Sequence, residues 1–140
     1  MDIALVAHDR KKPQMLEWAR HHRDLLLPHT IYSTAATGDL LEAEVGLKVR
    51  KTLSGPLGGD QQIGARIAQG EIDLLVFLWD PLESQPHESD VKALLRLAAV
   101  WDVPMASNES TAHMLITSQL LGVKDYRLTV PDAHAWRPAA

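Results

Sequence analysis

Ile3-Ala4-Leu5-Val6-Ala7, an unbroken apolar run near the start of the chain, indicates a β-strand that is covered on both of its faces. Leu74-Leu75-Val76-Phe77-Leu78 is a second run of the same kind. Strands buried on both faces are typical of parallel sheets, in which helices connect the strands and cover the sheet. The sequence therefore predicts an α/β fold with a mostly parallel sheet and helices on both faces.

Helical periodicity and weaker strand signals fill the intervals between these two runs. Apolar residues at three- and four-residue spacing follow Pro13, which favours a first helical position, and they predict a helix of about three turns that reaches Leu26. The other expected elements are strands over 30–34, 105–107 and 128–130, and helices over 37–45, 60–69, 91–98 and 110–121. Gly46 and Gly70 follow two of these helices at the position where glycine often ends a helix.

Composition and charge exclude several classes of protein. The chain has 140 residues, with 14 Lys and Arg against 18 Asp and Glu for a formal net charge of −4, and it has no cysteine. The lack of cysteine excludes disulfides, thiolate metal sites and a cysteine nucleophile. The acidic balance disfavours a nucleic-acid partner, and no apolar run is long enough to span a bilayer. Since the first residues also lack the basic start of a signal peptide, we expect a cytoplasmic protein that does not associate with membranes.

Polar residues follow the expected strands at their carboxyl ends, where open parallel sheets bind ligands. His8-Asp9 follows the first strand, residues 34–38 follow the second, and Asp80-Pro81 follows the Leu74 run ahead of residues 87–90. A fourth segment, Ser54-Gly55-Pro56-Leu57-Gly58-Gly59-Asp60, leads into a helix. These four loops are expected to converge on one edge of the sheet.

The glycine-rich segment 54–60 brings backbone N–H groups to a helix N-terminus, a combination suited to an anion. It lacks the spacing and the lysine of a nucleoside-triphosphate loop. The alternative is a plain connector in which Asp60 caps the helix. Lys12 lies near another helix start, where a cation is unfavourable unless an anionic ligand compensates, although a solvated lysine is the simpler interpretation. Thr34 and Thr37 offer hydroxyls at a third helix start, where capping also explains Thr37.

Two histidines adjoin carboxylates in these loops. His8 precedes Asp9, and His87 precedes Glu88 and Asp90, so acid and base groups can be tuned near neutral pH. No His-x-x-x-His or His-Glu-x-x-His spacing occurs, and we expect no metal site. A phosphate-binding site surrounded by carboxylates and histidines predicts proton transfer on a small phosphorylated carbonyl compound.

Three parts of the chain resemble the methylglyoxal synthase family: residues 6–9, the string from Leu53 to Gln62, and residues 79–82 with Pro86-His87 and residues 90–96. The resemblance spans about Ile3 to Pro131. It implies a Rossmann-like three-layer domain over residues 1–131, followed by a C-terminal tail over 132–140. It also implies a homohexameric lyase that converts dihydroxyacetone phosphate to methylglyoxal and inorganic phosphate through an enediolate, with inorganic phosphate as an allosteric inhibitor and with neither metal nor organic cofactor. Such an enzyme bypasses part of glycolysis.

The resemblance also implies roles for individual residues. Asp60 matches the catalytic base, and His87 matches the histidine that polarises the carbonyl oxygen. Asp9, Asp80 and Asp90 match supporting carboxylates. The positions that match substrate-binding residues, chiefly for the phosphate, are His8, Lys12, Thr34, Ala35, Ala36, Thr37, Ser54 and Gly55.

One loop departs from the family pattern. Where the family has Thr-Gly-Thr-Thr-Gly, this chain has Thr34-Ala35-Ala36-Thr37-Gly38, so a glycine and a hydroxyl are replaced. The replacement predicts weaker phosphate binding. The alternative function is a weak or inactive effector-sensing module, similar to the regulatory domain of carbamoyl phosphate synthetase. The joint presence of Asp60, His87 and Asp90 favours the enzyme, because a sensor needs no base.

Overall fold

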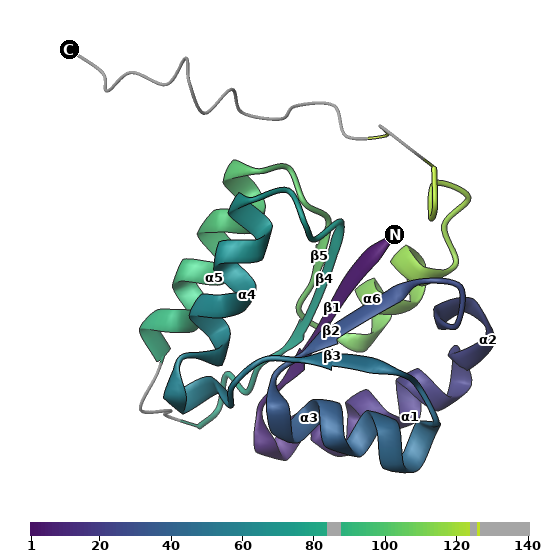
Figure 1. Cartoon of the computed structure of the whole chain (residues 1–140), viewed down its shortest axis with the longest axis horizontal. Coiled ribbons are helices and arrows are strands. Elements are labelled where there is room, and N and C mark those ends of the chain that lie inside the picture. Colours follow the sequence, from purple (N-terminus) through teal and green to yellow (C-terminus); the bar gives the residue numbers. More distant parts are fainter. Residues whose placement is uncertain (84–87, 124–125, 127–140) are drawn as a thin grey trace.

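The computed structural model of the chain describes residues 1–83, 88–123 and 126. At its centre is a five-stranded sheet in the order β3-β2-β1-β4-β5 (Figure 1). All four pairings between neighbouring strands are parallel. The strands are β1 (Asp2–Ala7), β2 (Thr30–Ser33), β3 (Val49–Lys51), β4 (Leu74–Leu78) and β5 (Met105–Ala106).

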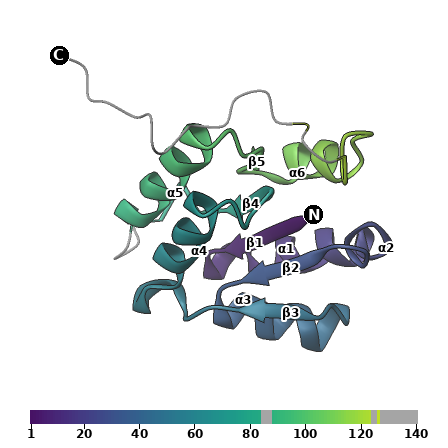
Figure 2. The ribbon, with the colours of Figure 1, turned by 45° about the horizontal axis from the view of Figure 1, so that its top comes forward.

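Helices cover both faces of this sheet (Figures 1 and 2). One face carries α4 (Gly59–Ala68) and α5 (Glu88–Val100), and the other carries α1 (Lys12–His21), α3 (Ala35–Leu40) and α6 (Glu109–Ile116). A short helix, α2 (Arg23–Leu26), follows α1. The predicted three-layer α/β fold is confirmed. None of the helices in the described residues is both long and apolar enough to cross a membrane.

Successive side chains of β1 pack alternately into the two hydrophobic cores, one on each face of the sheet. Ile3, Leu5 and Ala7 pack in the core that also contains residues of α1 and α6, whereas Ala4 and Val6 pack in the core under α4 and α5. Successive side chains of a strand point to opposite faces, so a central strand covered on both sides must be apolar throughout. The opening run of the sequence therefore occupies the middle of the sheet.

Two helices end earlier than the sequence predicted. The helix after Pro13 is interrupted at His22, whose φ of −110° and ψ of 19° separate α1 from α2. The last helix ends at Ile116 instead of residue 121, and at its C-terminus both the N–H and the hydroxyl of Thr117 donate to the carbonyl of His113, at 3.1 Å and 2.7 Å. The strand expected over 128–130 and the tail over 132–140 lie outside the described residues.

The other helix predictions hold with small shifts of their ends. The helix expected over 37–45 begins at Ala35, turns π-helical over Leu41–Val45 and ends at Gly46, whose φ is 74°. That positive φ suits glycine, as expected for the residue that follows a helix. The helix expected over 60–69 is α4, and the one expected around 91–98 is α5.

Helices α1 and α6 meet at a pair of histidines. His22 is 6% exposed, and its Nε2 lies 3.2 Å from Nδ1 of His113. Burial, and then the charges of His113 and of His21, lower the pKa of the His22 imidazole below its ordinary 6.5. The folded protein therefore favours neutral His22.

We expect the free energy of unfolding to fall as the pH drops below about 6.5, the ordinary pKa that His22 has in the unfolded chain. Between that pH and the lowered pKa of the folded state, the unfolded chain binds more protons than the folded protein does. The stability that neutral His22 contributes is therefore complete above this pH window and lost below it. Urea unfolding across the window measures the slope, which His22→Gln should reduce. His21→Gln, on an exposed neighbour, should reduce it less. Equal slopes in wild type and His22→Gln would contradict the assignment.

Candidate active site

A cavity of about 390 Å³ opens at the carboxyl edge of the sheet. Because the sheet is parallel, the loops that follow its strands emerge at this edge together. The cavity is lined by Val6, Ala7, His8, Asp9, Lys12, Thr34, Ala36, Ser54, Gly55, Pro56 and Asp60. Residues from the loops after β1, β2 and β3 and from the start of α4 thus surround one small space, as predicted. The described residues of the loop after β4, which was also expected at this space, do not line it.

His8 follows β1, and its ring is held in place by a residue that comes just after β4. The ring is 7% exposed, and its Nδ1 accepts a hydrogen bond from the backbone N–H of Asp80 at 3.0 Å. An imidazole nitrogen that accepts from an N–H carries no proton, so the proton of neutral His8 lies on Nε2. The Asp80 carboxylate in turn accepts from the N–H of Leu82 at 3.0 Å, which fixes the turn after β4. His8 therefore offers this cavity a neutral hydrogen-bond donor.

Lys12 supplies the positive charge of the cavity. It is the first residue of α1, and its ammonium group forms an ion pair with the carboxylate of Asp9. The Lys12 side chain is 16% exposed, whereas the Asp9 side chain is 94% exposed. A carboxylate so open to water is poorly suited to act as a base on carbon, and Asp9 here offsets the charge of Lys12. An incoming phosphate would compete with Asp9 for the lysine.

The loop after β2 contributes Thr34 and Ala36. Thr34 is buried and precedes α3, and Ala35 and Ala36 are the first two residues of that helix. Since Ala35 is helical, alanine in place of the family's glycine causes no backbone strain there. The Thr37 hydroxyl donates to the carbonyl of Ala7 at 3.4 Å and is buried, so it stabilises the protein and does not line the cavity.

The glycine-rich segment between β3 and α4 places a buried carboxylate beside the cavity. The N–H of Gly59 donates to the Ser54 carbonyl at 2.9 Å, which closes the segment into a tight turn. A Cβ added to Gly59 would lie 1.9 Å from the carbonyl oxygen of Leu53, so the close approach of these two backbone stretches requires glycine. Asp60 follows in the first turn of α4 and is 2% exposed. Its charge is favoured there by the helix N-terminus.

Two glutamines after Asp60 connect the neighbouring loops. Gln61 Nε2 donates to Asp90 Oδ1 at 2.5 Å, and Gln62 Oε1 accepts from the N–H of Leu53 at 2.8 Å. Asp90 lies in the first turn of α5 and does not line the cavity, so its connection to Asp60 runs through Gln61. Neither glutamine was predicted to have a role. Their position directly after Asp60 was the available signal.

Comparison with known proteins agrees with this geometry. A family model described as an MGS-like domain matches residues 14–107. Methylglyoxal synthase of Coxiella burnetii (strain Dugway 5J108-111) is 53% identical over 135 residues, which cover 96% of this chain and 94% of that protein. Methylglyoxal synthase of Pseudoalteromonas translucida (strain TAC 125) is 56% identical over 131 residues, 94% of this chain and 84% of that one. The chain belongs to the methylglyoxal synthase family.

A solved structure extends the likeness to the methylglyoxal synthase fold. The crystal structure of methylglyoxal synthase from Elizabethkingia anophelis NUHP1 superposes with a TM-score of 0.86 at 42% sequence identity. The match covers 99% of this chain and 92% of that one. The fold implied by the resemblance to the methylglyoxal synthase family is confirmed.

The structure brings together most of the residues that the resemblance to methylglyoxal synthase singled out. Eight of them line the cavity: His8, Asp9, Lys12, Thr34, Ala36, Ser54, Gly55 and Asp60. Ala35 and Thr37 adjoin cavity residues in α3 but do not line it, and neither do Asp80, after β4, or Asp90, in α5. His87 lies outside the described residues.

The cavity of this methylglyoxal synthase family member combines three chemical capacities. A buried carboxylate can accept a proton, a neutral imidazole can donate a hydrogen bond to a developing oxyanion, and a lysine with nearby backbone N–H groups can hold a dianion. Within residues 1–83, 88–123 and 126, no three His, Asp or Glu side chains are grouped to hold a metal ion.

Proposed function

We propose that this chain is a methylglyoxal synthase that converts dihydroxyacetone phosphate to methylglyoxal and inorganic phosphate. The observation that carries the proposal is a carboxylate, Asp60, buried to 2% exposure beside a cavity that it shares with His8 and Lys12. Membership of the methylglyoxal synthase family supports the substrate. A phosphorylated ketone of three carbons needs a base, an oxyanion donor and a cation, and these are the groups present.

The first step removes a proton from the hydroxymethyl carbon beside the carbonyl. Asp60 takes the proton, the C–H electron pair forms a carbon–carbon double bond, and the carbonyl oxygen becomes the enediolate oxyanion. Such a carbon is a weak acid, so the base must work in a water-poor place and the oxyanion needs a donor. Burial of Asp60 meets the first need. The Nε2–H of His8 is a donor at the same cavity.

The second step expels the phosphate. The hydroxyl on the deprotonated carbon gives up its proton, and its O–H electron pair forms the aldehyde C=O. The carbon–carbon double bond shifts to the carbon that bears the phosphate, and the C–O bond breaks with its electron pair on the leaving phosphate. The enolate that remains takes up one proton on carbon and becomes methylglyoxal. Lys12 and the N–H groups of Ser54 and Gly55 support the leaving anion, because charge develops on it as the bond breaks.

The remaining assignments are carried over from the family. We assign His87 to the carbonyl oxygen as the polarising donor. Asp90, held by Gln61, and Asp9, paired with Lys12, act as supporting carboxylates around the base and the phosphate. Asp80 fixes the ring of His8 through its backbone N–H.

Assembly and regulation complete the proposal. We assign the protein to a cytoplasmic homohexamer that inorganic phosphate inhibits, as the resemblance to the family implies. Phosphate is the product of the reaction and fits the same cation and N–H groups as the substrate's phosphate, which supports competition at this cavity.

A direct assay tests the function. Purified protein with dihydroxyacetone phosphate should release methylglyoxal, measured colorimetrically, together with one equivalent of inorganic phosphate. Folded protein that forms no product would support the effector-sensing module instead.

Ala36→Thr should lower both KM and the inhibition constant of phosphate by about tenfold, because it returns a hydroxyl to an exposed cavity position where a charged acceptor binds. The turnover number should change little, since Asp60 and His8 are untouched. Ala35→Gly is the matched control, and we expect no gain from it because Ala35 is helical and does not line the cavity. If Ala36→Thr leaves both constants unchanged, position 36 does not contact phosphate.

A further inference from the structure

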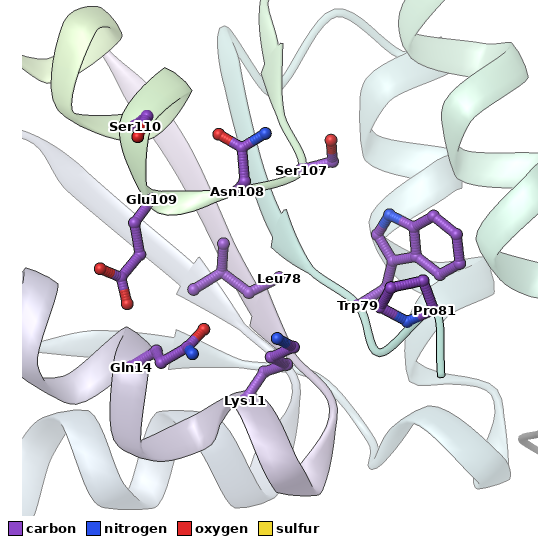
Figure 3. A pocket seen from close by; sticks show the side chains of 9 residues that line it. All are labelled: Lys11, Gln14, Leu78, Trp79, Pro81, Ser107, Asn108, Glu109 and Ser110. Carbon is purple, nitrogen blue, oxygen red and sulfur yellow. The ribbon is translucent and has the colours of Figure 1, made fainter. Parts of the chain in front are cut away.

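A second cavity, of about 460 Å³, lies where the strand order reverses (Figure 3). From β1 the chain proceeds to β2 on one side, whereas β4 and β5 extend the sheet on the other side. Sheets of this kind commonly bind ligands at the carboxyl ends of the two strands on either side of such a reversal. The cavity is walled by the start of α1, the end of β4 and the loop between β5 and α6, and it shares no lining residue with the candidate active site.

A cation and an anion line this second cavity. Lys11 extends its ammonium group toward the middle of the space, and Glu109, at the start of α6, reaches down toward Gln14 (Figure 3). Within the part of the chain that the structure describes, neither Lys11 nor Glu109 belongs to an ion pair. The two opposite charges therefore line one space without neutralising each other.

Neutral residues complete the surroundings of these charges. The Gln14 amide can both donate and accept a hydrogen bond, and Leu78 and Pro81 give an apolar wall. The volume lies within the range of about 300–1,000 Å³ that is usual for small-molecule sites. A simple anion would meet the charge of Glu109, and a simple cation would meet that of Lys11. A ligand that carries both charges satisfies both side chains.

We propose that this cavity binds a free α-amino acid in its zwitterionic form. The carboxylate of the ligand pairs with Lys11, and its ammonium group pairs with Glu109. The side chain of the ligand lies against Leu78 and Pro81, where Gln14 can bind its polar groups.

The second cavity is also connected to the ring of His8. The backbone N–H of Lys11 donates to the carbonyl of His8 at 2.8 Å. Pro81 directly follows Asp80, whose N–H holds His8 Nδ1 at 3.0 Å. An amino acid bound between Lys11 and Pro81 therefore contacts both segments that position His8.

Calorimetric titration of the full-length protein at low ionic strength tests the binding directly. We expect L-serine, L-glutamine or L-methionine to bind, and L-serine to bind about fivefold or more tightly than either lactate or ethanolamine, each of which carries one of the two charges. No binding by any of the three amino acids, or lactate binding as tightly as L-serine, would overturn the proposal.

Variants assign the binding to this cavity. Lys11→Gln and Glu109→Gln should each weaken amino acid binding by about fivefold. Lys48→Gln, on an exposed lysine just ahead of β3 at the opposite edge of the sheet, should leave binding unchanged. Thermal unfolding shows that each variant is folded. Unchanged affinity in both cavity variants would place any binding elsewhere and overturn the proposal. Because the readout is binding, the result does not depend on methylglyoxal synthase activity.

Discussion

Asp60→Asn is expected to reduce turnover of dihydroxyacetone phosphate by on the order of 10²-fold or more, while the protein remains folded. Asparagine keeps the shape of the side chain in the first turn of α4, but it cannot accept the proton from carbon. Since Asp60 is 2% exposed, little bulk water reaches this side chain to replace it as a base. Methylglyoxal release and far-ultraviolet circular dichroism measure the two quantities.

Asp39→Asn is the matched control for this experiment. Asp39 is an exposed carboxylate that pairs with Lys51 at 2.9 Å, away from the cavity, and its loss should leave turnover near that of wild type. Near wild-type turnover in Asp60→Asn would contradict the assignment of Asp60 as the base. Asp90→Asn and Asp9→Asn would then test whether another carboxylate takes up the proton.

Gly59→Ala should produce a large structural effect for a single added methyl group. The new Cβ would lie 1.9 Å from the carbonyl oxygen of Leu53 and 2.9 Å from the carbonyl carbon of Ser54, so backbone must move. We expect a loss of about 1–3 kcal/mol or more in the free energy of unfolding. We also expect kcat/KM to fall by more than about tenfold, because the displaced segment carries Ser54 and leads into Asp60.

Gly64→Ala provides the comparison within the same helix. Its added Cβ would meet Leu97 Cδ1 at 3.0 Å and Leu94 Cδ2 at 3.5 Å, which are the ends of flexible side chains. Alanine is also favoured over glycine inside a helix by about 1 kcal/mol, so the variant should be close to neutral in stability. Equal stability of the two variants in urea unfolding would show that the segment before Asp60 yields more easily than its backbone contacts indicate.

The sheet could be predicted from the sequence because its central strands are apolar on both faces. The runs that begin at Ile3 and Leu74 became β1 and β4, which pair directly in the middle of the sheet. The interruption at His22 could not be predicted, since His22 meets His113 from a position 91 residues away in the chain. Local periodicity contains no information on such a contact.

The location of the candidate site could be predicted for a related reason. Parallel strands release their loops at one edge, so polar residues after several strands were expected to meet. Which of these side chains line the cavity could not be predicted in the same way. Thr37 and Ala36 are adjacent in the sequence, but one is buried against the carbonyl of Ala7 and the other lines the cavity. That difference depends on the orientation of α3 against β1.

The central position of β1 also has a consequence for synthesis on the ribosome. β1 pairs with β2 on one side. Its other edge stays unpaired until β4, in which Leu74 lies opposite Ile3, has been synthesised. Roughly 45 residues separate the end of β2 from the end of β4, so at translation rates of about 5–20 residues per second this edge stays open for about 2–9 seconds. During that interval the nascent chain presents an unpaired strand that is apolar from Ile3 to Ala7, which is a template for association with other chains. Chaperone contact with the first half of the protein is therefore most valuable before Leu78 emerges.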